Sequence, residues 1–493
     1  MDHHPAAGTS GLCNPETPMK KPQHIVILGA GESGVGAALL AKQKGYKVLV
    51  SDTNMLAPNL REELSRADID FEEGGHSLDK LLQADLVVKS PGIPQNAAVV
   101  VELRLRGVEI VSEIEFGFRH CPHRNIIAVT GTNGKTTTCK LIYDILQRDG
   151  QDVGLAGNIG YGFCRMLAIQ PHDCYVLEVS SFQLEDCYMF HPHIAVLTNL
   201  AENHLDRYNG SMDAYAAAKF RIVQRQGPQD HFITSMDSPE GLRYLARHAV
   251  EAQLHLFSRM SHPAVVAWTT ATSLHFMSYS QAPPQPSGSG RSRKNQVLKF
   301  ALENQALARE ANRQNAMAAG VVANLKNARK ESIRDSFTTF ENEPHRLEKV
   351  NVVEEVEFIN DSKATNVNAT WYALSEFKKP VIWIAGGVDK GADFTMLADM
   401  VEKHVRALVT IGRDGKRIQE AFGHLNIDMQ HCDTMDEAVA LGFKWAKKGE
   451  SVLLSPAMAS FDMFSNYEFR GEAFKAAIRR IVRNLSKSAE EEA

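Results

Sequence analysis

A run of glycines, a lysine and threonines at residues 129–138 contains the groups needed to bind the phosphates of a nucleotide. It reads Val-Thr-Gly-Thr-Asn-Gly-Lys-Thr-Thr-Thr. A glycine-rich turn at the start of a helix directs free backbone N–H groups and the positive end of the helix dipole at an anion. Lys135 can reach terminal phosphates, and the hydroxyl of Thr136 can ligate Mg²⁺. The predicted phosphate-binding loop consists of Gly131, Thr132, Asn133, Gly134, Lys135, Thr136 and Thr137.

The spacing of this loop separates it from the commonest phosphate-binding loops. Its pattern, Gly131-x-x-Gly134-Lys135-Thr136, is two residues shorter than the standard G-x-x-x-x-G-K-[ST] loop. The difference points away from ordinary P-loop GTPases. The alternative, a plain turn between a strand and a helix, gives the Lys-Thr pair no role.

Two further polar side chains follow strands that we expect to neighbour this loop. Glu178 ends the predicted strand 174–179, and His204 follows the predicted strand 194–200. Ligands of open α/β sheets bind beyond the carboxyl ends of the strands, so these groups are expected to meet the loop. Mg²⁺ prefers oxygen ligands, which makes Thr136 and Glu178 candidate metal ligands. A single histidine in a loop is more often structural, but the position of His204 favours a role at a second metal.

A second glycine-rich turn, Gly29-Ala-Gly-Glu-Ser-Gly34, directly follows the predicted strand 24–28 and opens a helix. Asp52 lies 18 residues beyond Gly34, at the end of the next predicted strand. The pattern is typical of dinucleotide binding, in which the acidic residue meets a ribose hydroxyl. The same turn could hold the pyrophosphate of another nucleotide, such as a UDP-sugar. The motif leaves both interpretations open.

Three loops in the last third of the chain follow predicted strands and carry polar and cationic side chains. They lie at residues 360–366, 386–393 and 455–461. Such loops suit a substrate that bears carboxylates. Well-capped helix starts with solvated lysines are the alternative for any one loop, but three together favour binding.

The elements that position these motifs recur as alternating short apolar strands and helices. The remaining predicted strands are 47–50, 85–89, 108–111, 125–129, 356–360, 380–385, 405–411 and 451–454. After the phosphate loop, Leu141, Ile142, Ile145 and Leu146 fall on one face of a predicted helix. This alternation predicts an α/β fold with parallel, doubly wound sheets.

We expect three domains. They are a Rossmann-like N-terminal domain (23–117), a central P-loop-type ATPase domain with a mostly parallel sheet (118–342) and a C-terminal Rossmann-like domain (343–493). Residues 258–300 include Pro283-Pro-Gln-Pro-Ser-Gly-Ser-Gly290 and break the pattern, which indicates a flexible loop or an edge-strand insertion.

Composition excludes several classes of protein. The net charge of −5 gives no footprint for nucleic acid. No apolar run reaches the roughly 18 residues of a membrane span. Residues 1–22 have no apolar core of a secretory signal and are expected to be a disordered tail. The seven cysteines form no C-x-x-C pair, so neither a disulfide framework nor a zinc site is indicated. We expect a cytoplasmic protein.

Together, the motifs resemble the Mur ligase family, the ATP-dependent amide-forming enzymes of peptidoglycan synthesis. The resemblance runs from about residue 23 to 485. It rests on segments 29–34, 90–93, 130–136, 178–184, 360–366 and 386–394. These segments are most similar to the members that add D-glutamate to UDP-N-acetylmuramoyl-L-alanine. A sister ligase or a folylpolyglutamate-synthase-like ligase with another amino acid is the nearest alternative. A nicotinamide dehydrogenase and a non-catalytic nucleotide switch are more remote.

The resemblance implies roles that the residues alone do not give. The UDP-linked substrate would meet Ser33, Asp52, Thr53, Ser90, Gly92 and Asn158. ATP would meet the phosphate loop together with Asn312, Asn315, Arg346 and Asp361. D-Glutamate would meet Lys363, Thr365, Lys390, Ser460, Phe461 and Tyr467. Thr136, Glu178, His204 and Lys219 would hold two Mg²⁺ ions, and Lys135, Glu178, His204 and Lys219 would be the catalytic residues.

The resemblance also implies that Lys219 is carbamylated, whereas the residues around it predict an ordinary lysine on a helix surface. The implied reaction passes through an acyl phosphate, and we expect a monomer. Departures from the family pattern fall at Asn203, Arg309 and Ala311, where relatives usually carry Asp, Gly and His. They weaken the assignments of Asn312 and Asn315.

Overall fold

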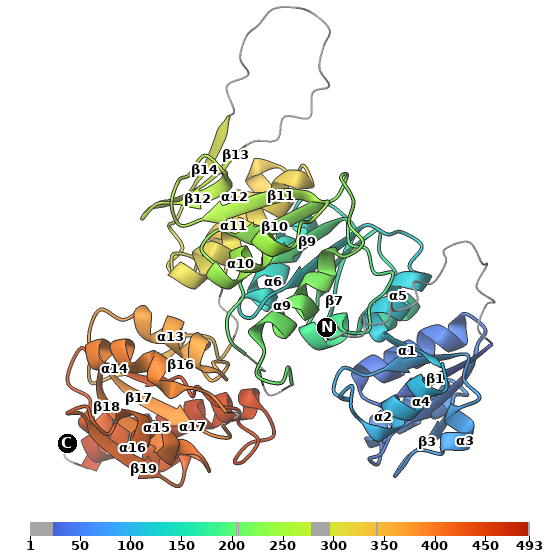
Figure 1. Ribbon diagram of the computed structural model, residues 1–493. Coiled ribbons are helices and arrows are strands. Elements are labelled where there is room, and N and C mark those ends of the chain that lie inside the picture. Colours follow the sequence, from blue (N-terminus) through green and yellow to red (C-terminus); the bar gives the residue numbers. More distant parts are fainter. Residues whose placement is uncertain are drawn as a thin grey trace, which may run out of the picture. The chain divides into compact units, whose positions relative to one another are not determined.

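The computed structural model describes residues 23–203, 205, 207–277, 296–341, 344–389 and 391–491. The expected tail 1–22, His204 and Lys390 lie outside the described residues. The chain divides into two compact units, which meet in the sequence between Val111 and Ser112, and each is described by itself. Three sheets, each with helices packed on it, make up the fold (Figure 1).

The first unit holds one five-stranded sheet in the order β3-β2-β1-β4-β5. Its strands are β1 (His24–Leu28), β2 (Lys47–Ser51), β3 (Asp70–Glu72), β4 (Leu86–Lys89) and β5 (Glu109–Ser112). Its helices are α1 (Glu32–Gln43), α2 (Pro58–Arg66), α3 (Leu78–Leu81) and α4 (Ala98–Leu105). Strand β1 pairs in parallel with β2 and β4, and its apolar residues lie in the core. Parallel strands buried on both faces read as continuous apolar runs, which is why these segments were recognisable.

The first sheet of the second unit has nine strands in the order β14-β13-β12-β11-β10-β9-β6-β8-β7. They are β6 (Ile126–Thr130), β7 (Val153–Gly157), β8 (Cys174–Glu178), β9 (Ile194–Leu197), β10 (His231–Ser235), β11 (Gln253–Ser258), β12 (Val265–Thr269), β13 (Ser273–Met277) and β14 (Val297–Ala301). Within the expected insertion at 258–300, β13 pairs antiparallel with β12, and it also pairs antiparallel with β14 at the end of the sheet. Residues 278–295 lie outside the described part of the chain.

Nine helical segments accompany the nine-stranded sheet among the described residues. They are α5 (Glu113–His120), α6 (Lys135–Arg148), α7 (Phe163–Ile169), α8 (Ser181–Leu184), α9 (Met212–Phe220), the short η1 (Arg221–Val223), α10 (Pro239–Arg247), α11 (Glu310–Leu325) and α12 (Lys330–Thr338). The predicted apolar face of α6 is confirmed, since Leu141, Ile142, Ile145 and Leu146 are all buried in the core. Helix α6 packs against α11 and α12, so the start of α6 is held firmly beside the end of β6.

The third sheet has the order β15-β16-β20-β17-β18-β19. Its strands are β15 (Glu348–Val353), β16 (Val356–Asn360), β17 (Val381–Gly386), β18 (Val405–Ile411), β19 (Asp428–Cys432) and β20 (Ser451–Leu454). Its helices are α13 (Val367–Ser375), η2 (Phe394–Leu397), α14 (Ala398–His404), α15 (Gly415–Phe422), α16 (Met435–Trp445) and α17 (Tyr467–Glu491). Only β15 pairs antiparallel among the strand pairs described here. The predicted α/β architecture with mostly parallel sheets is confirmed.

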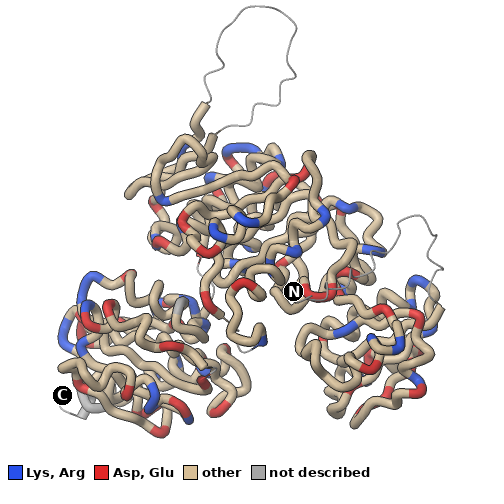
Figure 2. Tube along the Cα trace, in the orientation of Figure 1, with Lys and Arg blue, Asp and Glu red and all other residues tan. Residues whose placement is uncertain are grey.

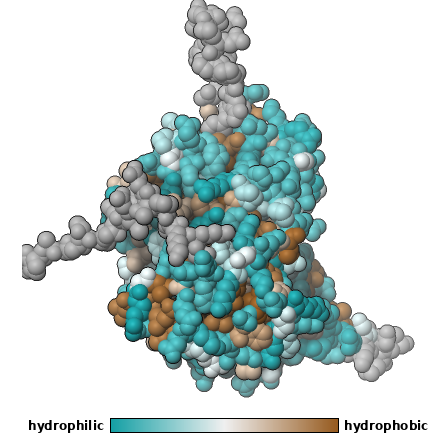
Figure 3. All heavy atoms as spheres, turned by 90° about the vertical axis from the view of Figure 1, so that its right-hand side faces the viewer, coloured by the Kyte–Doolittle hydropathy of each residue, from teal (hydrophilic) through white to brown (hydrophobic). Residues whose placement is uncertain are grey.

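The distribution of charged and apolar residues agrees with the mixed composition of the chain. Figure 2 shows Lys and Arg interspersed with Asp and Glu along the trace. Figure 3 shows one face that is largely hydrophilic, with brown apolar residues in small separate groups. Within the described ranges, no helix is long and apolar enough to cross a membrane.

Candidate functional site

The phosphate loop lies between the end of β6 and the first turn of α6. Gly134 directly precedes the helix and has a φ of 81°, and Gly131 has a φ of 145°. Both angles lie in the region that favours glycine. A Cβ atom on Gly134 would collide with the side chain of Asn315, which packs against the loop from α11. The two glycines of the motif are therefore required by backbone conformation and close packing.

The end of β9 pins this loop through two residues that sequence reasoning did not assign. The Thr198 hydroxyl donates to the Asn133 carbonyl at 2.6 Å. The Asn199 side chain accepts from the Asn133 N–H at 3.0 Å and donates to its carbonyl at 3.1 Å. Their place directly after an apolar strand next to β6 was the available signal, because such positions face the carboxyl edge.

Two lysines meet at one carbonyl group of the loop. Lys135 donates to the Gly131 and Thr132 carbonyls, both at 2.9 Å, and Lys219 donates to the same Gly131 carbonyl at 2.8 Å. The prediction that Lys219 is an ordinary surface lysine is wrong: its side chain is 2% exposed. Helix α9 turns this residue inward under the phosphate loop, a contact between residues far apart in the sequence.

Burial and neighbouring positive charges lower the pKa values of both ammonium groups. Burial lowers the pKa of Lys219 well below its usual value, the charge of Lys135 lowers it further, and Glu178 partly opposes both effects. Burial is also the largest cause that lowers the pKa of Lys135, again opposed by Glu178. A lysine with a lowered pKa is more often present as the neutral, nucleophilic amine.

Tyr215 links α9 to the loop one turn before Lys219. Its hydroxyl lies 3.2 Å from the Thr132 hydroxyl, and the Lys219 ammonium lies 4.8 Å from the centre of its ring. Residues four apart on a helix share a face, so the pair reaches the same loop. No role was predicted for Tyr215 from the sequence, because its contact with Thr132 joins residues 83 positions apart.

Glu178 lies at the end of β8, next to β6, with its side chain 3% exposed. One carboxylate oxygen accepts from the Asn158 amide at 3.0 Å. The other, Oε2, is buried without a hydrogen-bond partner. A buried carboxylate oxygen without a partner is costly unless a cation or donor satisfies it, and it suits an oxygen-preferring divalent ion. No group of three His, Cys, Asp or Glu side chains among the described residues is arranged to hold a metal by itself.

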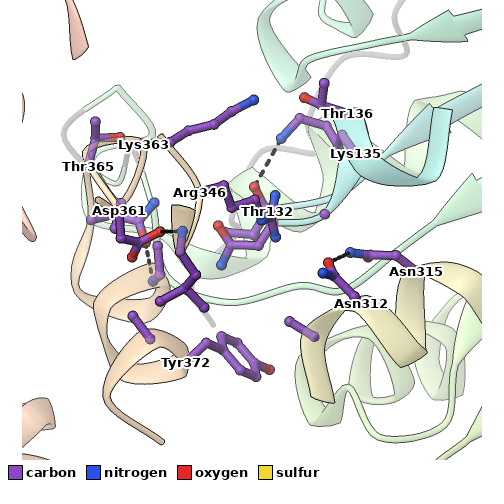
Figure 4. A pocket seen from close by; sticks show the side chains of 18 of the residues that line it. Thr132, Lys135, Thr136, Asn312, Asn315, Arg346, Asp361, Lys363, Thr365 and Tyr372 are labelled. Carbon is purple, nitrogen blue, oxygen red and sulfur yellow. Dashed lines mark hydrogen bonds between the residues drawn. The ribbon is translucent and has the colours of Figure 1, made fainter. Parts of the chain in front are cut away.

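A cavity of about 660 Å³ opens in front of the loop. Its far wall comes from the third sheet and α13, and Figure 4 shows Lys363 extending toward Lys135 and Thr136 across the space. Of the predicted residues, those that line it are Thr132, Asn133, Gly134, Lys135, Thr136, Asn158, Glu178, Asn312, Asn315, Arg346, Asp361, Lys363, Thr365 and Tyr467. The structure thus brings most of the predicted ATP set to one cavity, together with Tyr372, which was not predicted.

The asparagines of α11 sit at the base of this cavity. Asn312 donates to the Ala306 carbonyl at 2.8 Å, and both asparagines are 4% exposed. The neighbouring departure from the family pattern, Arg309, donates to the Leu347 carbonyl at 2.7 Å. Arg309 therefore connects the start of α11 to the segment that carries Arg346.

Asp361 follows β16 and is also deeply buried, at 4% exposed. Burial raises its pKa to about 7, although bonds from the Ser455 hydroxyl (2.9 Å) and the Leu347 N–H (3.1 Å) partly oppose the shift. This carboxyl can change charge near neutral pH at the edge of the cavity.

Only some of the residues predicted to bind the amino-acid substrate line this cavity. Ser460 is buried at 2% exposed, whereas Phe461 is 69% exposed. The loops after β17 and β20 lie side by side, because Val388 and Ala459 form an antiparallel bridge. Lys390 of the same set lies outside the described residues.

In the first unit the glycine turn, Asp52 and Ser90 come together. Asp52 accepts from the Ala30 N–H at 2.7 Å, and the Ser90 hydroxyl donates to the Gly29 carbonyl at 3.3 Å. Gly29 has a φ of 93°, and a Cβ there would meet the Ser90 side chain. Ser33, Thr53 and Gly92 lie at or near the surface around this turn. The arrangement is a nucleotide-type turn, which does not by itself select the nucleotide.

A phosphate loop with two converging lysines, a buried carboxylate beside it, and a facing α/β sheet with further cations are typical of an ATP-dependent ligase. Comparison with known families supports this class. Residues 23–112 match the Mur ligase MurD-like N-terminal domain, 129–323 the Mur ligase middle domain, and 345–458 the Mur ligase glutamate ligase domain.

Individual relatives extend the similarity over nearly the whole chain. A UDP-N-acetylmuramoylalanine–D-glutamate ligase of Bacteroides fragilis is 43% identical over 93% of this chain and 100% of the relative. The enzyme of the same name from Porphyromonas gingivalis is 43% identical over 92% of this chain and 98% of its own. The chain therefore belongs to the Mur ligase family.

Solved structures share the fold at low sequence identity. A pseudomurein peptide ligase type C from Methanothermus fervidus superposes with a TM-score of 0.59 at 18% identity, covering 93% of this chain and 100% of its own. The UDP-N-acetylmuramate-alanine ligase of Thermotoga maritima gives 0.56 at 16% identity, covering 94% and 100%. These likenesses support the three-sheet architecture.

Proposed function

We propose that this protein is an ATP-dependent ligase that joins D-glutamate to UDP-N-acetylmuramoyl-L-alanine in peptidoglycan precursor synthesis. The observation that carries the proposal is the similarity, at 43% identity over more than nine-tenths of the chain, to ligases named for that reaction. The MurD-like match of the first unit makes a nicotinamide dehydrogenase the poorer explanation of the Gly29–Gly34 turn. The cytoplasmic location and the monomeric state expected from the sequence stay predictions.

The reaction proceeds in two steps. A carboxylate oxygen of the L-alanyl substrate attacks the γ-phosphorus of ATP, which forms an acyl phosphate and releases ADP. The amine of D-glutamate then attacks the acyl carbon, loses a proton and expels inorganic phosphate. Catalysis is mainly positioning and charge neutralisation, as in phosphoryl transfer generally.

The residues of the loop do most of this work. The loop N–H groups bind the phosphates, and Lys135 exchanges its bonds to the Gly131 and Thr132 carbonyls for phosphate oxygens. Arg346 approaches from the opposite wall and neutralises the charge that moves to the leaving group. Asn312, Asn315 and Asp361 border the ATP. Water must be excluded from the acyl phosphate before the amine attacks it.

Mg²⁺ would be held by Thr136, Glu178, His204 and Lys219, with two ions and a carbamylated Lys219 as the finer proposal. The Oε2 atom of Glu178, which has no hydrogen-bond partner, supports Glu178 as a ligand of Mg²⁺. The lowered pKa of Lys219 supports its carbamylation, because the neutral amine is the form that reacts with CO₂. When bound, the metal neutralises phosphate oxygens and orients them.

The residues proposed to bind the UDP-linked substrate and D-glutamate are those of the sequence motifs. Ser33, Asp52, Thr53, Ser90 and Gly92 would bind the UDP moiety, and Asn158 the muramoyl part. Lys363, Thr365, Lys390, Ser460, Phe461 and Tyr467 would bind D-glutamate.

The decisive experiment measures phosphate release with UDP-N-acetylmuramoyl-L-alanine and ATP against a panel of amino acids. We expect release to depend on D-glutamate, with L-glutamate, glycine and L-lysine as comparison acceptors. Release that depends on a different amino acid would identify a sister ligase. Release that is independent of any acceptor would refute the ligase assignment.

A further inference from the structure

Arg470 is one of the largest fully buried side chains of the described residues, at 1% exposed. It lies in the first turn of α17 and does not line the large cavity. Its guanidinium donates to the Ser362 hydroxyl at 3.0 Å, the Ser362 carbonyl at 2.9 Å, the Met458 carbonyl at 3.1 Å and the Gly386 carbonyl at 3.4 Å. One side chain thus satisfies four acceptors.

These acceptors belong to three different loops. Ser362 follows β16, Gly386 ends β17, and Met458 follows β20. In the sheet, β20 lies between β16 and β17, so Arg470 joins the carboxyl ends of three adjacent strands. The three loops are those that the sequence marked as carriers of substrate-binding side chains.

The contacts that surround Arg470 make this connection specific. The Ser362 hydroxyl itself donates to the Tyr467 carbonyl at 2.8 Å, which closes the link between the first loop and α17. A Cβ atom on Gly387 would lie 3.3 Å from the Arg470 guanidinium, so the second loop approaches it closely. Burial lowers the pKa of Arg470 to about 9, and the charges of Asp462 and Asp361 oppose this effect.

A planar guanidinium can serve several acceptors in fixed directions, which the single ammonium of a lysine does not reproduce. Removing it leaves buried carbonyl groups without donors, and the loops must shift to find others. Small shifts of binding groups are enough to weaken a positioned substrate strongly.

We propose that Arg470 is a positioning residue that fixes the three loops relative to one another, so that their side chains can bind the amino-acid substrate. It acts through Lys363, which directly follows Ser362, and through Ser460, two residues beyond Met458. The inference rests on the proposed function and adds to it a residue that touches no substrate. Its loss weakens use of the amino acid while the first step, on the phosphate-loop side, continues.

The test compares Arg470→Lys and Ser362→Ala with the wild type. Arg480→Met is the matched control, because Arg480 lies on the same helix, is 53% exposed and pairs with Asp436. The readouts are the KM for D-glutamate, kcat, and single-turnover ADP formation from ATP and UDP-N-acetylmuramoyl-L-alanine without amino acid. Thermal unfolding of each variant shows that it is folded.

We expect Arg470→Lys to raise the KM for D-glutamate by about tenfold or more, the equivalent of one or two buried hydrogen bonds. ADP formation should stay within about threefold of the wild type, because the groups on the phosphate-loop side are unchanged. Ser362→Ala, which removes one acceptor, should move the KM in the same direction by a smaller factor, and Arg480→Met should leave it unchanged.

A folded Arg470→Lys protein with an unchanged KM for D-glutamate would overturn the inference. So would a fall in ADP formation as large as the rise in KM, because that result indicates a general structural role. If Arg470→Lys does not fold, Ser362→Ala decides by the same criteria. A wild-type protein without D-glutamate-dependent phosphate release would instead refute the proposed function.

Discussion

Replacing Asp361 by Asn is expected to change how stability depends on pH. The carboxyl is buried, and its pKa of about 7 lies well above its ordinary value of 3.8. An asparagine has nearly the same shape and never ionises. Its amide can donate to the Ser455 hydroxyl, which in turn lies 3.1 Å from the Thr370 hydroxyl and can donate to it. The substitution therefore removes the titration with little change in packing.

The sign of the effect follows from the two pKa values. The unfolded carboxyl loses its proton near pH 3.8, whereas the folded one keeps it until about pH 7. Between these values the folded state binds more protons, so this group makes the free energy of unfolding fall as pH rises. At ~1.4 kcal/mol per unit, the loss between pH 5 and pH 7 is about 2 to 3 kcal/mol, and stability levels off above about pH 8.

The assay is denaturant unfolding of wild type and Asp361→Asn without nucleotide at several pH values from 5 to 8. Buried histidines such as His345, whose pKa is lowered by burial, change stability with the opposite sign. These histidines are present in both proteins, so their effects cancel in the difference between the two free energies of unfolding. We expect the variant to gain on the wild type by the stated amount as pH rises from 5 to 7. A difference that is independent of pH would show that Asp361 is ionised throughout and would refute the reasoning.

Three further substitutions probe the phosphate side of the cavity. Lys135→Ala should abolish ADP release measured by a coupled assay, and near-normal turnover would contradict the scheme. Gly134→Ala should weaken ATP binding in calorimetric titration by about tenfold or more, because the positive φ and the contact with Asn315 both oppose a Cβ; an unchanged affinity would show that the loop adapts. Glu178→Gln should raise the Mg²⁺ concentration needed for half-maximal activity by about tenfold or more while keeping the contact to Asn158 possible. An identical Mg²⁺ dependence would remove Glu178 from the proposed ligands.

The sequence predicted those features that depend on local patterns. Continuous apolar runs identified the parallel strands, and the position of Glu178 after one of them predicted its place beside the loop. Both are short-range properties, because a parallel strand is apolar throughout and its carboxyl end is where ligands bind. The glycine positions followed from the conformations that only glycine adopts readily.

The burial of Lys219 and the role of Arg470 were not predicted from sequence patterns, because both depend on contacts between distant segments. Lys219 reaches a carbonyl 88 positions away, and Arg470 reaches a hydroxyl 108 positions away. Nothing in the helix Met-Asp-Ala-Tyr-Ala-Ala-Ala-Lys-Phe shows that its lysine turns inward, since a lysine on a helix is normally solvated. Burial of such a charge is decided by the loop that covers it.

The arrangement of cations explains why the cavity suits a polyanion. Lys135 and Lys219 share the Gly131 carbonyl, so two positive groups compete for one acceptor. The charges of Lys363 and Arg346 act on Lys135 in the same unfavourable direction. Buried like charges are costly, and a triphosphate relieves that cost by supplying the acceptors that the backbone alone provides poorly. For Lys219, the charge of Glu178 offsets only part of the repulsion from Lys135, and a bound γ-phosphate would supply a further negative charge. Burial, together with the repulsion from Lys135, therefore accounts for the lowered pKa of Lys219, and the cations that line the cavity account for the proposed affinity for ATP.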